Sequence, residues 1–360
     1  MRPLTDDRLQ HLRAVVDLPD LTGTKYEVIR KLDRGGMGTI YTARDTELDR
    51  EVALKVLSAP DPSDDLSARL VEEAKHLARL EHPNIVPVHD VGRLPDGRAF
   101  YAMKLVRGKR LDVWHEEGAA RPAALRLFQK VCGAMAFAHS HGVLHRDLKP
   151  ENIMVGSFGE ALVMDWGVAK RLRTSASLPS GPPSHQAASA SDEPAAPERD
   201  TLDRGVTAHG AVIGTPAYMA PEQARGEVAD LDARTDVYAL GAILYFLLAG
   251  RPPFGGSHHD VLRLVTETGP PPLRQIDPGI ARPLASICAK AMAREPSGRY
   301  SSAQQMANDV ERFLDGLPVL AHHETLLEKA GRVLGRNRAL LLLVLAYLIA
   351  RAAILAATGR

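Results

Sequence analysis

Residues 145–152 read His-Arg-Asp-Leu-Lys-Pro-Glu-Asn. This octapeptide places a carboxylate, an ammonium group and an amide close together along the chain. Asp147 could accept a proton from a hydroxyl group, Lys149 could neutralise a moving phosphoryl group, and Asn152 could hold a metal ion. The spacing predicts phosphoryl transfer, a reaction in which such groups act mainly by positioning and by neutralising charge.

Composition limits the classes of protein to which the chain can belong. It has 360 residues, 45% of them hydrophobic and 25% charged, which is typical of a globular protein with one large or two smaller domains. The formal net charge is +1, so we expect no nucleic-acid partner. Two cysteines, Cys132 and Cys288, make neither a disulfide framework nor a metal-type pair, which fits a reducing cytosolic setting for the main body.

The pattern of residues divides the chain into segments. Residues 1–25 predict a polar N-terminal extension with helical character, residues 26–106 a β-rich segment with one helix, and residues 107–316 a mainly helical segment. Within the last of these, residues 171–208 shift to Ser, Pro, Ala and Gly. Such a run cannot bury enough apolar surface to order itself, so it predicts a disordered insertion.

A glycine-rich stretch lies between two strand-like runs early in the chain. Gly35, Gly36 and Gly38 fall within residues 32–41. Glycine lets backbone N–H groups approach phosphates closely. A glycine hairpin is the alternative for this motif taken by itself.

A single lysine, Lys55, follows inside the apolar strand of residues 52–56. An unpaired buried charge is costly, so this position predicts an anionic partner. Glu73, on the next predicted helix, and the phosphates of ATP could supply the negative charge. A surface lysine with its stem on the sheet is the alternative.

Met-Asp-Trp-Gly at residues 164–167 follows a predicted strand. Mg²⁺ prefers octahedral oxygen ligands that are shared between protein and phosphate. Asp165 and Asn152 supply such oxygens and leave the other positions to ATP and water. A plain turn is the alternative for the tetrapeptide alone.

In this order the motifs resemble those of the eukaryotic-like serine/threonine protein kinases of bacteria. The resemblance covers about residues 26–314 and implies an α+β fold with a small β-rich N-lobe (26–106) and a large helical C-lobe (107–316). It implies ATP and Mg²⁺ (or Mn²⁺) as cofactors, bound in the cleft between the lobes. It further implies protein substrates with Ser or Thr acceptors, autophosphorylation in the activation loop, and a dimer of kinase domains as a partner state.

The resemblance assigns roles to individual residues. Asp147 would be the catalytic base, Lys149 the contact to the γ-phosphate, and Asn152 and Asp165 the metal ligands. Lys55 would contact the α- and β-phosphates and pair with Glu73. Ile40 would cover the adenine, Met103 would be the gatekeeper, and residues 104–106 would form the hinge. The residues implied in ATP binding are Leu32, Gly35, Gly36, Gly38, Ile40, Lys55, Glu73, Met103, Lys104 and Val106.

Residues 214–222 resemble the segment of the family that docks the substrate peptide. Thr215 would bond to Asp147 and Lys149 and would complete the catalytic set of Asp147, Lys149, Asn152 and Thr215. This threonine favours Ser/Thr over Tyr acceptors. The segment also favours protein substrates over the alternative of a small-molecule kinase.

Three further residues match structural positions of the family. Glu222 would pair with the distant Arg299, and Asp236 would anchor the backbone of the catalytic loop. None of these has a chemical role in the transfer.

Two positions depart from the family pattern. Asp33 stands where the first glycine of the loop is usual, and its charge could weaken nucleotide affinity. Trp166 replaces the usual phenylalanine of Asp-Phe-Gly. These departures are the features in favour of a catalytically silent pseudokinase scaffold, which is the alternative function.

Regulation is predicted from the long segment between Asp165 and Glu222. In the family, the arginine before the base, here Arg146, pairs with a phosphorylated activation loop. We expect Thr207 to be the autophosphorylation site that meets Arg146. An ordinary loop threonine is the alternative.

The C-terminal tail predicts an anchor. Residues 317–338 form a basic juxtamembrane segment, and residues 339–357 have about the length of a transmembrane helix. The basic residues before it predict a single-pass inner-membrane protein with a cytoplasmic kinase domain. Arg351 is the objection, and a soluble C-terminal helix on a cytoplasmic protein is the alternative.

Overall fold

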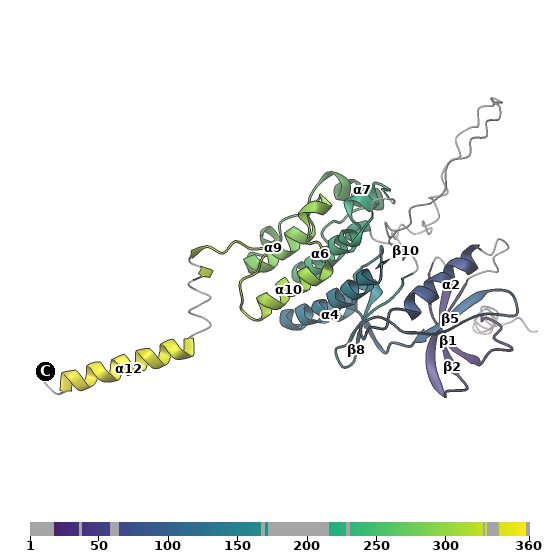
Figure 1. Ribbon diagram of the computed structural model, residues 1–360, viewed down its shortest axis with the longest axis horizontal. Coiled ribbons are helices and arrows are strands. Elements are labelled where there is room, and N and C mark those ends of the chain that lie inside the picture. The colour runs from purple at the N-terminus through teal and green to yellow at the C-terminus, as the bar shows by residue number, and fades with distance from the viewer. Residues whose placement is uncertain are drawn as a thin grey trace, which may run out of the picture.

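The computed structural model describes residues 18–35, 38–57, 65–166, 170–171, 216–227, 231–326, 328–329 and 338–357. Figure 1 shows two lobes, one built from strands and one from helices. The predicted β-rich N-lobe and helical C-lobe are both present, so the prediction of this two-lobed architecture is confirmed.

The N-lobe is one antiparallel sheet with a helix on one face. Its strand order is β1-β2-β3-β5-β4, and helix α2 (Asp65–Ala78) packs against β4 and β5. The strands are β1 (Tyr26–Arg34), β2 (Gly38–Asp45), β3 (Arg50–Leu57), β4 (Val88–Arg93) and β5 (Ala99–Lys104).

Alternation along β3 determines which side chains reach the cleft. Val52, Leu54 and Val56 pack into the cluster on one face of the sheet, together with Tyr26 and Phe100. Successive side chains of a strand point to opposite faces. Residues 53, 55 and 57 therefore share the other face, and Ala53 and Leu57 pack there. Lys55 is thus directed to the side of the sheet that carries α2.

The C-lobe packs its helices around α6 (Ala233–Ala249). Fourteen of the residues of α6 are buried, from Thr235 to Leu248. The helix begins after Asp232, whose side chain accepts the N–H of Arg234, and it ends at Gly250 with a φ of 68°, as helix caps commonly do. The main helices around it are α4 (Arg121–Ser140), α7 (His258–Glu267), α9 (Arg282–Ala291) and α10 (Ala303–Leu314).

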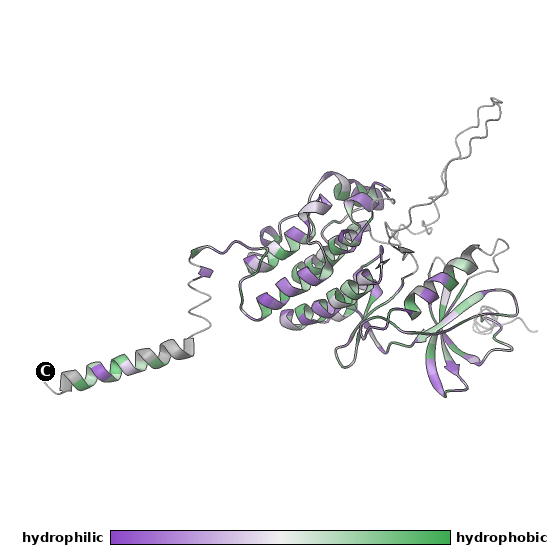
Figure 2. Ribbon diagram, viewed as in Figure 1, coloured by the Kyte–Doolittle hydropathy of each residue, from purple (hydrophilic) through white to green (hydrophobic). Residues whose placement is uncertain are grey.

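Helix α10 illustrates how sequence periodicity builds this core. Its buried residues include Ala303, Met306, Ala307 and Val310, which recur at the three- and four-residue steps of one helix face. Figure 2 shows hydrophobic and hydrophilic residues side by side on the helices of this lobe. The apolar face of α10 lies against α4 and α9.

Short elements between the lobes carry the catalytic loop. A three-stranded sheet has the order β6-β8-β9, and β7 pairs with β10. These elements are β6 (Gly108–Arg110), α3 (Leu111–Glu116), β7 (Val143–Leu144), the 3-10 turn η1 (Pro150–Asn152), β8 (Ile153–Gly156), β9 (Ala161–Val163) and β10 (Lys170–Arg171). Further short elements of the C-lobe are η2 (Pro216–Tyr218), α5 (Pro221–Ala224), α8 (Leu273–Ile276) and η4 (Pro296–Gly298).

Near both ends of the chain the structure differs from the sequence prediction. Residues 1–17 lie outside the described part of the chain, and residues 18–25 form bends and turns rather than a helix. The predicted insertion at 171–208 also falls almost entirely outside it. Residues 317–322, assigned to a juxtamembrane segment, instead pack on α10. There the buried carboxylate of Asp309 accepts the N–H groups of Leu320 and Ala321 at 2.8 and 2.9 Å.

Helix α12 (Arg338–Ala357) lies where the sequence predicted a membrane span. In the part of the chain that the structure describes, none of the helices has the length and apolar character needed to cross a bilayer. The predicted transmembrane helix at 339–357 is therefore not supported by the described residues. Arg351 lies within α12, and a charged side chain is costly in hydrocarbon.

Candidate active site

A cleft of about 610 Å³ lies between the two lobes. This volume is within the range of small-molecule sites. Of the residues predicted to bind ATP, the cleft is lined by Leu32, Ile40, Met103, Lys104 and Val106, and the metal candidates Asn152 and Asp165 line it as well.

Four apolar residues of the cleft were missed by the sequence prediction. Ile29 lies on β1, Ala53 lies on β3, Met154 lies on β8, and Met164 follows β9. Alternation could have identified two of them: Ala53 is two residues before Lys55, and Met154 is two residues after Asn152. Together with Ile40 and Leu32 they make an apolar slot that suits a purine ring.

The catalytic loop brings three predicted residues together. The Lys149 Nζ lies 2.7 Å from Asp147 Oδ2. The Asn152 Nδ2 donates to the Asp147 backbone carbonyl at 2.7 Å and approaches Oδ2 at 3.3 Å. Both contacts engage Oδ2, so Oδ1 is the Asp147 oxygen that is left for a substrate proton. The Asp147 side chain is 42% exposed, which leaves it accessible from the cleft.

His145 helps to fix the position of this loop. It is fully buried, and its Nε2 lies 2.9 Å from the carbonyl oxygen of Met164. A carbonyl can only accept, so Nε2 carries the proton, and Nδ1 accepts the N–H of Asp147 at 3.4 Å. The Trp166 ring packs on the imidazole with centroids 4.7 Å apart. Trp166 is thus a packing residue that supports the loop.

Asp165 also lines the cleft, and it pairs with Lys55. Their Oδ1 and Nζ atoms are 3.1 Å apart. Partial burial would raise the pKa of the Asp165 carboxyl, but the Lys55 ammonium outweighs it, and the pKa lies below its usual value of 3.8. Asp165 is therefore ionised at neutral pH. The side chain of Glu73 lies outside the described residues.

Asn152 and Asp165 offer suitable oxygens for a divalent cation. The Asn152 amide uses Nδ2 for Asp147, so its Oδ1 is the atom that can bind a cation. Among the described residues, no group of three or more His, Cys, Asp or Glu side chains forms a metal site. A cation at this position would take two protein oxygens and complete its shell with phosphate and water, as Mg²⁺ does.

Asp236 anchors the catalytic loop to the C-lobe core. Its fully buried carboxylate accepts the N–H of His145 and of Arg146, each at 2.9 Å, and contacts His139 Nε2 at 2.8 Å. Burial raises the pKa of Asp236, but the hydrogen bonds and the His139 ring bring it below the usual value. The prediction that Asp236 anchors the backbone of the catalytic loop is confirmed.

Arg146 connects the loop to the segment that follows it. Its carbonyl accepts from Gln223 Nε2 at 2.8 Å, which ties the loop to α5. Burial lowers the pKa of its guanidinium, and Asp236 offsets part of this effect. The Arg146 Nε is enclosed and meets no acceptor within the described ranges. The predicted autophosphorylation site Thr207 and the predicted catalytic Thr215 both lie outside those ranges.

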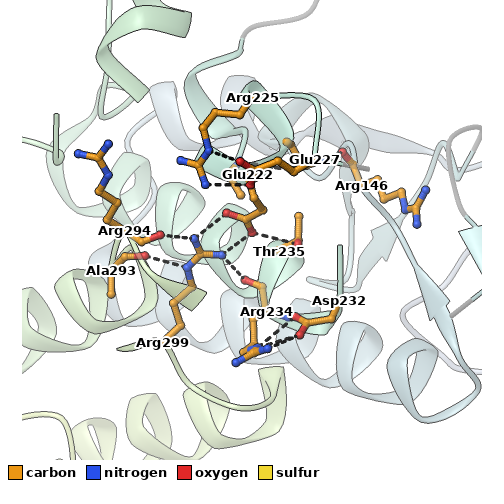
Figure 3. Close-up of polar contacts among 12 residues, drawn as sticks. Arg146, Glu222, Arg225, Glu227, Asp232, Arg234, Thr235, Ala293, Arg294 and Arg299 are labelled. Atoms are coloured by element: carbon orange, nitrogen blue, oxygen red, sulfur yellow. Dashed lines mark hydrogen bonds and ion pairs between the residues drawn. The ribbon is translucent and has the colours of Figure 1, made fainter. Parts of the chain in front are cut away.

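The predicted ion pair between Glu222 and Arg299 is confirmed (Figure 3). The guanidinium donates to both carboxylate oxygens, at 2.7 and 2.8 Å. It also donates to the backbone carbonyls of Arg234, Ala293 and Arg294. The pKa of Glu222 lies below its usual value, because the arginine outweighs the effect of burial.

The glycine loop is partly described. The Gly35 N–H donates to the Gly38 carbonyl at 2.8 Å, while Gly36 lies outside the described residues. A Cβ on Gly38 would lie 2.4 Å from the Val56 carbonyl oxygen. Close pairing of β2 with β3 is therefore a structural reason for glycine at position 38. Asp33 lines the cleft, and its Oδ1 accepts the N–H of Arg34 at 2.7 Å.

A two-lobed fold with a purine-sized cleft, a buried loop anchor and a carboxylate–lysine–asparagine set defines the class of protein kinases. Comparison with known families agrees: the model for the protein kinase domain matches residues 26–310. The chain therefore belongs to the protein kinase family.

Relatives with known names narrow this assignment. The chain is 37% identical over 309 residues to the serine/threonine-protein kinase PknB of Mycobacterium leprae, a match that covers 83% of this chain and 44% of the relative. It is 35% identical to the serine/threonine-protein kinase PknD of Protochlamydia amoebophila, over 81% of this chain and 30% of that one. The chain thus spans less than half the length of these curated relatives.

Solved structures give the same result. The kinase domain of PknI from Mycobacterium tuberculosis matches with a TM-score of 0.57 and 27% identity, and it covers 82% of this chain and 98% of that one. The predicted family, eukaryotic-like serine/threonine kinases of bacteria, is confirmed.

Proposed function

We propose that this protein is an ATP-dependent serine/threonine protein kinase that acts in bacterial signalling. The observation that carries the proposal is the hydrogen-bonded set of Asp147, Lys149 and Asn152, together with the Lys55–Asp165 pair. Asn152 and Asp165, one from each set, line the cleft. The named relatives that support this activity are serine/threonine kinases.

The proposed step moves one phosphoryl group. The acceptor hydroxyl oxygen attacks the γ-phosphorus of ATP, the bond from that phosphorus to the β-bridging oxygen breaks, and ADP leaves. Asp147 orients the hydroxyl and takes its proton on Oδ1. Lys149, which lies 2.7 Å from Asp147 Oδ2, stabilises the charge on the transferring group.

Lys55 and the apolar slot position the nucleotide. The side chain of Lys55 is 8% exposed, so its charge is well shielded from solvent and acts strongly on the α- and β-phosphates. Asn152 and Asp165 would hold Mg²⁺ or Mn²⁺. When bound, the ion would neutralise phosphate charge. The predicted contacts of Gly36, Glu73 and Thr215 remain part of this proposal.

A transfer assay tests the proposal. The full chain would be incubated with γ-labelled ATP, Mg²⁺ or Mn²⁺, and a protein acceptor rich in Ser and Thr, and the phosphorylated amino acids would be identified. We expect label on Ser and Thr, and a rate lower by about 10²–10⁴-fold for Asp147→Asn. If the folded wild-type protein transfers no phosphate with either metal, the result would instead favour the pseudokinase scaffold.

The proposed activation step is autophosphorylation of Thr207, with two kinase domains associated as a dimer. The enclosed, unpartnered Nε of Arg146 supports it, since a phosphate could bond to this guanidinium. Mass spectrometry after incubation with Mg-ATP would test the site. Active protein without phosphate on Thr207 would refute this step and leave the transfer activity intact.

A further inference from the structure

A second cavity, of about 410 Å³, lies in the C-lobe away from the catalytic cleft. It is enclosed by Tyr245 of α6, the proline run at residues 270–272, the start of α8, one face of α9, and His322 of the C-terminal tail. It shares no lining residue with the cleft between the lobes. Its volume is within the range of sites that bind small molecules.

The walls of this cavity are apolar and fixed in place. The Tyr245 hydroxyl, which could otherwise point inward, donates to the Pro271 carbonyl at 3.0 Å. The Cys288 thiol donates to the Gly241 carbonyl at 3.3 Å. With these polar groups satisfied, proline rings, Leu273 and the alanines of α9 form most of the surface, which favours a hydrocarbon ligand.

Three basic side chains line the cavity. They are Arg274, Arg282 and His322, and no carboxylate lines it among the residues described. Two of the three already contact Glu328, which lies 3.1 Å from Arg282 and 3.4 Å from His322 Nε2. The His322 Nδ1 also lies 3.0 Å from the Ser286 hydroxyl.

Arg274 is the group that is left incomplete. Its Nη2 donates to the Pro278 carbonyl at 3.2 Å. Its Nε is enclosed, and it meets no acceptor in the part of the chain that is described. The Nε has almost no exposed surface, so a ligand would meet the guanidinium at its Nη groups, whose fork matches the geometry of a carboxylate. None of the carboxylates in the described ranges forms an ion pair with Arg274.

We propose that this cavity binds a medium-chain alkyl carboxylate, with its chain against the proline run and α9 and its head group on Arg274. The Arg274 guanidinium beside apolar walls selects an amphipathic anion over a neutral or a cationic amphiphile. The site is independent of the transfer reaction.

Binding of decanoate to the full chain, measured by titration calorimetry below the micellar concentration, tests the proposal. We expect saturable binding of one molecule per chain. Each methylene removed should weaken it by about fourfold, so octanoate should bind about fifteenfold more weakly. Decanol and decyltrimethylammonium should bind more weakly than decanoate.

Variants locate the site. Arg274→Gln should weaken decanoate binding by about tenfold, and Ala285→Leu should abolish it by filling the cavity. Arg263→Gln, on α7 and paired with Glu267 at 3.5 Å, is the matched control and should bind as wild type does. Equal binding of decanol, full affinity in Arg274→Gln, or no saturable binding would each overturn the proposal. Since no nucleotide is present, none of these results depends on kinase activity.

Discussion

The ion pair of Glu222 and Arg299 yields a prediction that can be derived from the contacts. Both side chains are buried, with 5% and 0% exposed. Removal of one partner from a buried pair typically costs about 3–5 kcal/mol, because an uncompensated charge is left behind. Each single variant leaves a different group unpaired, so we expect the two variants to lose different amounts of unfolding free energy.

Arg299→Met should be the more damaging change. It leaves a buried carboxylate whose remaining described partner is Thr235, at 3.1 Å, and it removes the donor from three backbone carbonyls. We expect a loss of about 4–5 kcal/mol. Glu222→Gln keeps the shape, and it leaves the guanidinium bound to those carbonyls. We expect a loss of about 2–3 kcal/mol.

Chemical denaturation followed by circular dichroism measures both losses, and its pH dependence provides a second check. The folded pKa of Glu222 lies below its usual 4.5, so the pair stabilises wild type above pH 4.5, and this contribution is lost as pH falls through the folded value. In Arg299→Met, the effect of burial on Glu222 exceeds that of the remaining hydrogen bonds and raises its pKa. Protonation of Glu222 then removes the buried charge, so the difference in unfolding free energy between the variant and wild type should narrow as pH falls.

Equal losses in the two variants, or a gap independent of pH between 4 and 7, would refute this reasoning. The double variant Glu222→Gln/Arg299→Met is the control for coupling. It should cost less than the sum of the single changes, since the two residues are in direct contact.

Three further outcomes follow from the close contacts and the buried carboxylate. Gly38→Ala should cost about 1–3 kcal/mol of unfolding free energy, because its Cβ would lie 2.4 Å from the Val56 carbonyl oxygen; in the matched control Gly35→Ala, the nearest atom would be 3.8 Å away. Gly241→Ala should cost a similar amount, since its Cβ would lie 2.7 Å from Met292 Cγ and 2.8 Å from Ala291 Cβ, and thermal unfolding would measure it. Asp236→Asn should lower stability by about 2–3 kcal/mol and lower kcat more than it raises KM, since it loosens the catalytic loop and leaves the apolar slot intact. An unchanged kcat would contradict that role.

The sequence predicted the lobes and the catalytic loop well because both depend on local patterns. Alternation in β3 and the spacing within residues 145–152 are set by neighbours along the chain. Which residues line the cleft depends less on local sequence patterns. Met164 follows a strand that is far in sequence from Ile40, and nothing in its own neighbourhood marks it as a wall of the slot.

Side-chain pairing was harder to predict than position. The motif order predicted that Lys55 pairs with Glu73, whose side chain lies outside the described residues, and it did not predict the contact of Lys55 with Asp165. That contact depends on how the path of residues 164–166 sets the distance between the two side chains. Such distances are properties of packing, and no spacing in the sequence records them.

The backbone at Arg146 and Asp165 is the feature that no pattern could predict. These two residues have φ values of 68° and 57°, in the left-handed region that costs a non-glycine residue about 1–2 kcal/mol. The conformation at Arg146 is held by Asp236, which binds its N–H, and by Gln223, which binds its carbonyl. Asp165 is held by the contact of its side chain with Lys55. Arg146 directly precedes the predicted catalytic base, and Asp165 is itself a predicted metal ligand, which is where strain is expected when the surrounding structure enforces a functional geometry. Substitution of either residue by glycine would relieve the backbone strain and would also remove the side chain. A glycine variant that is stable but inactive would indicate that the strain is kept for function and is not needed for folding.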